Sequence, residues 1–258
     1  MIDVKDFPEG TKLNFIYSAP ITDFYSKKLP YRYVSTNRFD TSSIGSVINI
    51  PFFHDKIDYS EIEYFVFEIS NSSDPIFITQ NIVFDLPKIR EVEFRAFRFA
   101  QDNCEVTFNL GEEFEEFFGI IQSTSSYHGM ITINSKSQKI KLFSQFNVSY
   151  FNGVVINCDC ENLTSSPYNA IYSNNNNNTT YHSGFPNCKY SQTGNYYDRM
   201  PNLTYESCIS ILNNLYDFAG NGVTPSSSQG KLKVNANFLT TVGDEITIAT
   251  NKGWTITS

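Results

Sequence analysis

The stretch LTYESCISILNNLYDF, residues 203–218, is the most regular part of the 258-residue chain and predicts an amphipathic helix. Thr204 is a suitable N-cap, and Glu206 lies in the first turn, where a negative charge is favourable. Gly220 is expected to end the helix. The apolar side chains follow helical spacing, at Tyr205, Cys208, Ile209, Leu212, Leu215 and Tyr216.

The residues after this helix predict a strand, a second helix and a last strand. Residues 231–234 have the pattern of a short strand. The second helix is expected to break at Gly243, with acidic residues at the new start, and to end at Gly253. Residues 254–256 form the last strand. The predicted order is helix, strand, helix, strand, in which the two strands can lie parallel.

Upstream, the first 148 residues predict short strands separated by turns. Residues 62–69 are apolar on both faces, as in a covered strand, and residues 71–75 supply a turn. Residues 91–96 alternate, and Phe97 and Phe99 then shift the phase, as a bulge would. This pattern favours a sandwich or an open barrel. We expect a mixed, mainly β chain: an antiparallel β-sandwich-like domain followed by a small α/β module.

The acidic segment 111–119 interrupts the strand pattern. Phe114, Phe117 and Phe118 are spaced i, i+3 and i+4, which predicts one helical turn with the four glutamates facing outward. Paired carboxylates suit acid–base chemistry or a hard cation, whose oxygen ligands must converge. Four glutamates on one short helix diverge, so a solvated face is favoured.

Composition excludes several classes of protein. With 19 Lys and Arg against 27 Asp and Glu, the net charge of −8 argues against a general nucleic-acid binder. Residues 1–6 begin no apolar signal segment, and no stretch approaches the ~18 apolar residues of a membrane span. Five cysteines, an odd number, then indicate reduced thiols in a chain made in the cytoplasm.

Three C-terminal segments resemble a known terminal module. Residues 203–207, 211–218 and 248–255 are similar to a module of bacteriophage minor structural and tail-fibre proteins, in which it often follows BspA-like leucine-rich repeats. The most specific portion is Ala-Thr-Asn-Lys-Gly-Trp at 249–254, and Phe-Pro-Asn-Cys at 185–188 resembles a repeat corner. The resemblance covers roughly residues 200–258. It implies a virion component whose C-terminal module closes the end of a repeat scaffold.

No sustained period of 20–29 residues is evident, so we expect at most one or two repeats. The expected division is a β-sandwich-like docking domain at 1–148 and a leucine-rich-repeat-like α/β module at 149–258, with an Asn-rich loop at 173–180. In the cap, Leu212 and Leu215 face inward beside strands that carry Leu232 and Trp254. Trp254 is read as core, with a sugar platform as the alternative.

Candidate binding residues are tyrosines near the Asn-rich loop. If exposed, they suit contacts with sugars or proteins, and a buried tyrosine is an equally ordinary reading. The four that we single out are Tyr181, Tyr190, Tyr196 and Tyr197.

Metal binding and catalysis have weak signals. Cys158, Cys160, His182 and Cys188 could be a zinc set, but the second half has an uncommon His-x5-Cys spacing, and apolar packing is the usual state of a free cysteine. The histidines are His54, His128 and His182, and nothing local marks a nucleophile beside them. We expect no catalytic residue, no metal and no cofactor.

Together these observations predict a structural virion protein of a bacteriophage, a tail, fibre or head-decoration component. It would act by assembly with other virion proteins and with itself, for which a homo-oligomer such as a trimer is expected. The alternative is a carbohydrate-binding, adhesin-like module that contacts a host-surface glycan. A glycan hydrolase is a third possibility, which would need paired carboxylates in a cleft.

Overall fold

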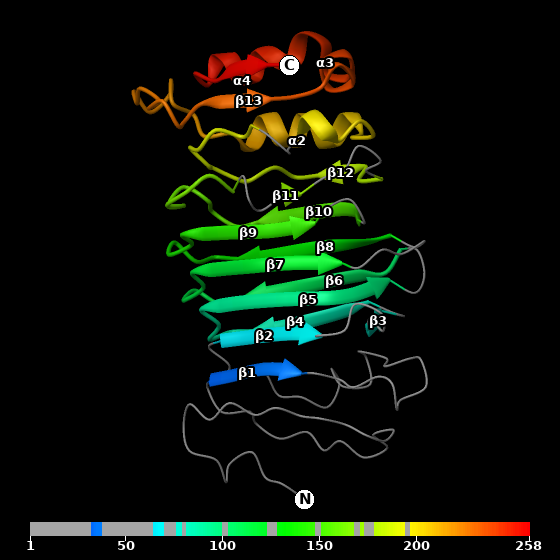
Figure 1. Ribbon diagram of the computed structural model, residues 1–258. Coiled ribbons are helices and arrows are strands. Elements are labelled where there is room, and N and C mark those ends of the chain that lie inside the picture. Colours follow the sequence, from blue (N-terminus) through cyan, green and yellow to red (C-terminus); the bar gives the residue numbers. More distant parts are fainter. Residues whose placement is uncertain are drawn as a thin grey trace, which may run out of the picture.

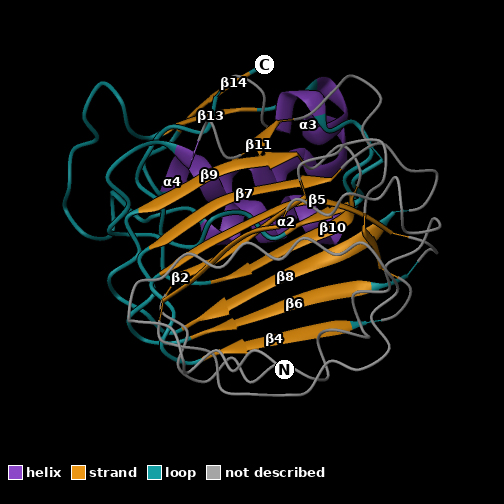
Figure 2. Cartoon of the chain, turned by 60° about the horizontal axis from the view of Figure 1, so that its bottom comes forward, coloured by secondary structure: helices purple, strands orange, loops and turns teal. Residues whose placement is uncertain are grey.

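The fold is a stack of coils whose strands form two parallel sheets (Figure 1). The computed structural model describes residues 32–37, 64–69, 76–78, 81–99, 103–122, 128–147, 151–167, 171–172, 178–193 and 197–258. Sheet I has strand order β1-β2-β5-β7-β9-β11 with β3 on β5, and sheet II has strand order β12-β10-β8-β6-β4. Figure 2 shows β4, β6, β8 and β10 side by side in sheet II.

The strands of sheet I are β1 (Arg32–Asn37), β2 (Tyr64–Ile69), β3 (Ile76–Ile78), β5 (Glu91–Phe99), β7 (Glu116–Gln122), β9 (Leu142–Asn147) and β11 (Ile171–Tyr172). The strands of sheet II are β4 (Ile82–Leu86), β6 (Glu105–Leu110), β8 (Gly129–Ser135), β10 (Phe151–Asn157) and β12 (Tyr181–His182). From β4 onward the chain visits sheet II and sheet I in turn, so each coil contributes one strand to each sheet.

The coils are in register. In sheet II, Ile82 pairs with Val106, Val106 with Ile131, and Ile131 with Val154. Asparagine contacts between successive coils join residues 24, 25 and 23 positions apart. The expectation of at most one or two repeats is therefore wrong. The repeat is easily overlooked because only a few positions of each coil carry similar residues, at a spacing that varies from 23 to 25.

Apolar side chains from both sheets fill the interior. Val92, Phe117 and Phe143 form one register column of sheet I, and all three are buried. Phe117 stacks on Phe143 at 6.1 Å between ring centroids and meets Phe108 of sheet II edge to face at 5.4 Å. Each such ring contributes about 1.5–3 kcal/mol by leaving water, so the aromatic column holds the two sheets together.

The prediction of an antiparallel sandwich is wrong, since every strand ladder in the described residues is parallel. Alternation of apolar and polar residues reports that one face of a strand is buried, and it carries no information about strand direction. The short turns between strands also favour the wrong prediction. Leu86 and Glu91 are separated by a turn short enough for a hairpin, but the chain leaves sheet II there and enters sheet I. Both sheets also continue across residue 148, through the β8–β10 and β9–β11 pairs.

The helical turn predicted at 111–119 is also wrong. This segment forms a corner and then enters β7 at Glu116. Phe114 and Phe117 are fully buried, as the spacing suggested, but the corner and the strand direct them inward. Tertiary packing against the neighbouring coils overrides a pattern that is too short to fix a helix.

The C-terminal part confirms the predicted order of elements. The helices are α2 (Tyr205–Asn214), α3 (Ala236–Val242) and α4 (Thr247–Asn251), with the 3-10 turns η5 (Tyr197–Arg199) and η6 (Gly243–Ile246). Strands β13 (Lys231–Lys233) and β14 (Thr255–Thr257) pair in parallel. Thr204 caps α2 by accepting a hydrogen bond from the Ser207 amide, and the following helix breaks at Gly243, which has a φ of 55°.

The end of α2 differs from the prediction. The helix stops at Asn214, and Leu215 already has extended backbone, so Gly220 lies outside it. The Lys252 ammonium donates hydrogen bonds to the carbonyl oxygens of Leu212, Asn213 and Leu215. The last carbonyls of α2 are thereby satisfied by a residue 40 positions from Leu212.

The cap continues the coil with helices in place of the strands of sheet II. The His182 amide of β12 donates to the Ser207 hydroxyl of α2, so α2 stacks where another strand would pair. On the opposite side of the stack, the Gly230 amide donates to the Lys189 carbonyl, and the Thr255 amide donates to the Gly230 carbonyl. Figure 1 shows α2, α3 and α4 at the C-terminal end of the stack. Within the described residues, no helix has both the length and the apolar character to span a membrane.

Candidate functional site

The four predicted tyrosines do not form one surface. Tyr181 lies half-buried in β12, with its hydroxyl 3.5 Å from the Ser210 hydroxyl. Tyr190 is half-buried on the opposite side of the stack, and its hydroxyl donates to the Thr164 carbonyl at 2.9 Å. Tyr197 is completely buried, so it belongs to the core. Tyr196 and the Asn-rich loop at 173–177 lie outside the described residues. A ligand role for these tyrosines stays a prediction.

The cysteines weighed as zinc ligands, Cys158, Cys160 and Cys188, are buried, as the favoured reading of apolar packing predicts. Burial raises the pKa of the Cys158 and Cys188 thiols to about 12, and it also raises the pKa of Cys160. The thiol of Cys158 lies against the Ile133 carbonyl, and that of Cys188 against the Tyr190 carbonyl. Within the part of the chain that the structure describes, no group of three or more His, Cys, Asp or Glu side chains is arranged to hold a metal ion.

His182 is a buried titratable group in the last strand of sheet II. Its side chain is fully buried, packed at 5.4 Å edge to face on Tyr197 and at 5.6 Å on Phe185. The Gly184 amide donates to Nδ1, so Nε2 carries the proton of the neutral ring. Burial lowers the His182 pKa to about 3, because removal from water disfavours the positively charged ring. His182 is therefore a neutral structural residue at ordinary pH.

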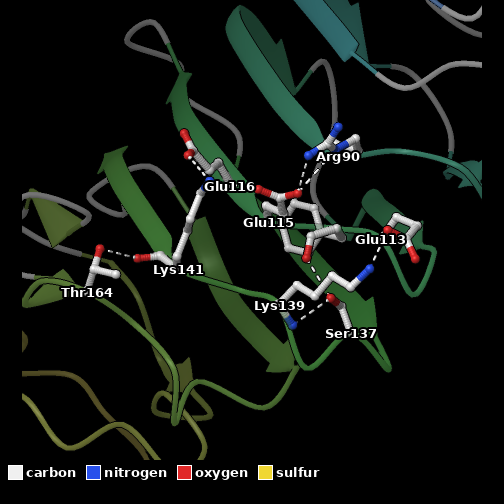
Figure 3. Close-up of polar contacts among 9 residues, drawn as sticks. Arg90, Glu113, Glu115, Glu116, Ser137, Lys139, Lys141 and Thr164 are labelled. Carbon is white, nitrogen blue, oxygen red and sulfur yellow. Dashed lines mark hydrogen bonds and ion pairs between the residues drawn. The ribbon is translucent and has the colours of Figure 1, made fainter.

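Charged side chains join successive coils along the corners that lead into sheet I. Figure 3 shows Glu115 between Arg90 of the preceding coil and Lys141 of the following coil. The hydrogen bonds from Lys141 and Arg90 lower the pKa of Glu115. Lys141 also reaches Glu116 at 3.2 Å, and Lys139 pairs with Glu113. These charges form coil-to-coil pairs and leave no isolated acid or base for catalysis among them.

The outer face of sheet II carries the feature that we regard as the candidate site. Four side chains occupy the same register position on successive strands, and we call them the amide stripe: Asp85, Asn109, Asn134 and Asn157. Each amide nitrogen donates to the side-chain oxygen of the preceding coil, at 2.6 Å to Asp85, 2.9 Å to Asn109 and 2.9 Å to Asn134.

The stripe is directional. An asparagine side chain both donates and accepts hydrogen bonds, whereas an ionised aspartate only accepts them. Asp85, the first member of the amide stripe, is therefore an acceptor only. The chain of amides is therefore polarised along the stack, from Asn157 towards Asp85.

A second column runs beside the stripe, two residues earlier on each strand. It consists of Val83, Thr107, Thr132 and Val155. Val83 is 42% exposed, and the hydroxyls of Thr107 and Thr132 both donate to Oε1 of Glu105. The face is thus a regular array of short side chains.

Sequence reasoning missed this site. The signal was present in the repeated order of an outward Val or Thr, an inward apolar residue and an Asx at 83–85, 107–109, 132–134 and 155–157. Each segment was read as an isolated strand, so the four were never compared at their 23- to 25-residue spacing.

The chain was compared with known protein families, with curated proteins and with solved structures. None of them matches it.

Proposed function

We propose that this protein is a non-catalytic binding scaffold and a structural component of a bacteriophage particle. One observation carries the first part: charged and amide side chains join one coil to the next at the corners and on sheet II. Arg90, Glu115 and Lys141 do so at the corners, and the amide stripe does so on sheet II. A stack of coils joined in this way presents regular outer faces, which suits holding a partner.

The assignment to a virion is supported by the resemblance of the C-terminal segments and by what those residues do. Two residues of the Ala-Thr-Asn-Lys-Gly-Trp segment hold the end of α2. The Lys252 ammonium donates to the Leu215 carbonyl, and the Trp254 indole donates to the Tyr216 carbonyl. An end cap of this kind covers the apolar interior that the last coil would expose. In a particle, the rest of the coil surface would remain for other virion proteins and for further copies of this chain.

Two measurements test the proposal. Light scattering on the purified protein is expected to give the mass of a homo-oligomer, two or more times the 29.4 kDa of one chain, and a mass of three chains would agree with a trimer. Particles purified from the host on a density gradient are expected to contain the chain in fixed proportion to the capsid protein. A monomer that never sediments with particles would contradict the proposal. Enzymatic turnover of a substrate would also contradict it, if that turnover were lost on substitution of a described side chain.

A further inference from the structure

The outer face of sheet II presents the same chemistry at a fixed repeat. Neighbouring strands of a sheet lie about 4.8 Å apart, so the amides of Asn109, Asn134 and Asn157 recur at that interval. A ligand that contacts all of them equally must itself be a polymer with a similar repeat. An extended β-linked polysaccharide has a rise per sugar close to the strand spacing, so each of its sugars can lie beside one strand.

The stripe retains hydrogen-bonding capacity after its internal bonds are made. Each asparagine amide has two N–H donors and an oxygen with two lone pairs. In Asn109 and Asn134 one donor and one lone pair are used by the neighbouring coils. One donor and one lone pair therefore remain on each, which matches sugar hydroxyls because a hydroxyl both donates and accepts.

The charge on this face selects among polymers. Asp85 begins the stripe and Glu105 lies beside it, and neither register column contains a Lys or Arg. The protein as a whole carries a net charge of −8. An anionic polymer, whether nucleic acid or a uronic-acid polysaccharide, would meet like charge where it crosses β4 and β6, beside Asp85 and Glu105.

Apolar groups flank the amides. Val83 is exposed, Val155 is half-buried, and Tyr181 occupies the register position next to Gly153 on the adjoining strand. Such side chains suit the C–H faces of sugar rings, which alternate with the hydroxyl edges. The face therefore combines hydroxyl partners and ring-face partners at one repeat.

We propose that the outer face of sheet II binds an extended, uncharged polysaccharide that runs across the strands, with one sugar beside each strand. This rests on the proposed function, since it names the ligand of the scaffold. It differs from the alternative in which the stripe only ties the coils together, because that alternative requires no ligand at all.

The test is calorimetric titration of the full chain with cello-oligosaccharides from the dimer to the hexamer. Affinity is expected to rise with each added sugar until the four strands that carry the stripe are spanned, and oligogalacturonates of equal length should bind more weakly. Val83→Lys places a long side chain over the stripe without touching the core, and it should weaken binding about tenfold. Val223→Lys is the matched control, since Val223 is 41% exposed in a loop of the cap.

Asn134→Leu, with Asn213→Leu on the exposed side of α2 as its control, tests the amides directly. The stripe variant should lose about tenfold in affinity, and the control should not change. The proposal is overturned if no oligosaccharide binds, if affinity does not depend on length, or if Val83→Lys binds as well as Val223→Lys. If binding fails while the chain is still found in purified particles, the ligand assignment alone falls and the proposed function stands.

Discussion

The indole Nε1 of Trp254 donates a 2.8 Å hydrogen bond to the carbonyl oxygen of Tyr216. Trp254 lies 38 residues further along the chain, is 3% exposed and packs on Phe218 at 5.7 Å. It therefore fastens the final turn of the cap to the segment that follows α2. The reading of Trp254 as core is confirmed.

Removal of this anchor should loosen the cap. Trp254→Phe keeps most of the packing but leaves the buried Tyr216 carbonyl without its donor, which costs about 1–3 kcal/mol of unfolding free energy. Trp254→Ala adds a cavity, for a total of about 3–5 kcal/mol. Urea unfolding followed by circular dichroism measures both. Equal stability of the two variants would mean that packing at this site is unimportant.

Lys252 makes a second link between the same parts of the cap. Lys252→Met keeps the aliphatic stem and removes the donors to the Leu212 and Leu215 carbonyls, so we expect a loss of about 1–2 kcal/mol. The matched control is Lys136→Met, because Lys136 is exposed at a corner of the coil. Both variants are compared by urea unfolding. A loss no greater than that of the control would contradict the role of Lys252 as the C-terminal cap of α2.

His182 should make the protein sensitive to acid. Its pKa is about 3 in the folded protein, against about 6.5 in the unfolded chain. Between these two pH values His182 is protonated in the unfolded chain and neutral in the folded protein. The free energy of unfolding is therefore highest above pH 6.5, falls as the pH drops towards 3, and does not change further below that. From pH 7.5 to 5 the loss due to His182 is about 2 kcal/mol.

The variant His182→Gln isolates this effect, because it keeps an acceptor for the Gly184 amide and cannot titrate. The unfolding free energy of His182→Gln should change less over the same pH interval than that of the natural chain. His128→Gln is the control, since His128 is half-buried at a corner. Identical pH profiles for the natural chain and His182→Gln would show that His182 is not buried in the neutral form.

Gln192 is a buried amide whose replacement should stabilise the protein. It is 1% exposed, and neither its side-chain nitrogen nor its side-chain oxygen has a hydrogen-bond partner in the described part of the chain. Its backbone bonds to Lys231 and Lys233 do not depend on the side chain. Gln192→Met keeps the shape and removes the unpaired polar atoms, so thermal unfolding should show a gain of about 1–3 kcal/mol.

The control for this change is Gln229→Met, since the Gln229 side chain accepts a hydrogen bond from the Ser226 amide. That variant should gain nothing. A destabilised Gln192→Met would indicate that the Gln192 amide is satisfied within the core.

The sequence predicted local features of this fold and missed its global arrangement. Thr204 as the cap of α2 and Gly243 as the break in the next helix were legible, because capping and positive φ depend on single residues. The inward direction of Phe114 and Phe117 was also correct. Their helical setting was not, because a corner followed by a strand can bury the same two rings.

Strand direction could not be predicted, and the repeat was overlooked, for a different reason. Val106 pairs with Ile82 and Ile131 through contacts between residues about 25 positions apart, and nothing in any one strand specifies its neighbour. The stripe was missed for the same cause, since Asn109 and Asn134 acquire meaning only once they share a register. The four tyrosines are close in sequence, but the coil places Tyr181 and Tyr190 on opposite sides of the stack.

The register of sheet II is the most direct test of the account, since the scaffold and its ligand face both depend on it. Spin labels attached to cysteines at Val83 and Thr107, Val83 and Thr132, and Val83 and Val155 sample one column of outward positions. Dipolar broadening should report separations that grow by about 4.8 Å for each strand crossed. Separations that do not increase in the order Thr107, Thr132, Val155 would contradict the parallel coil.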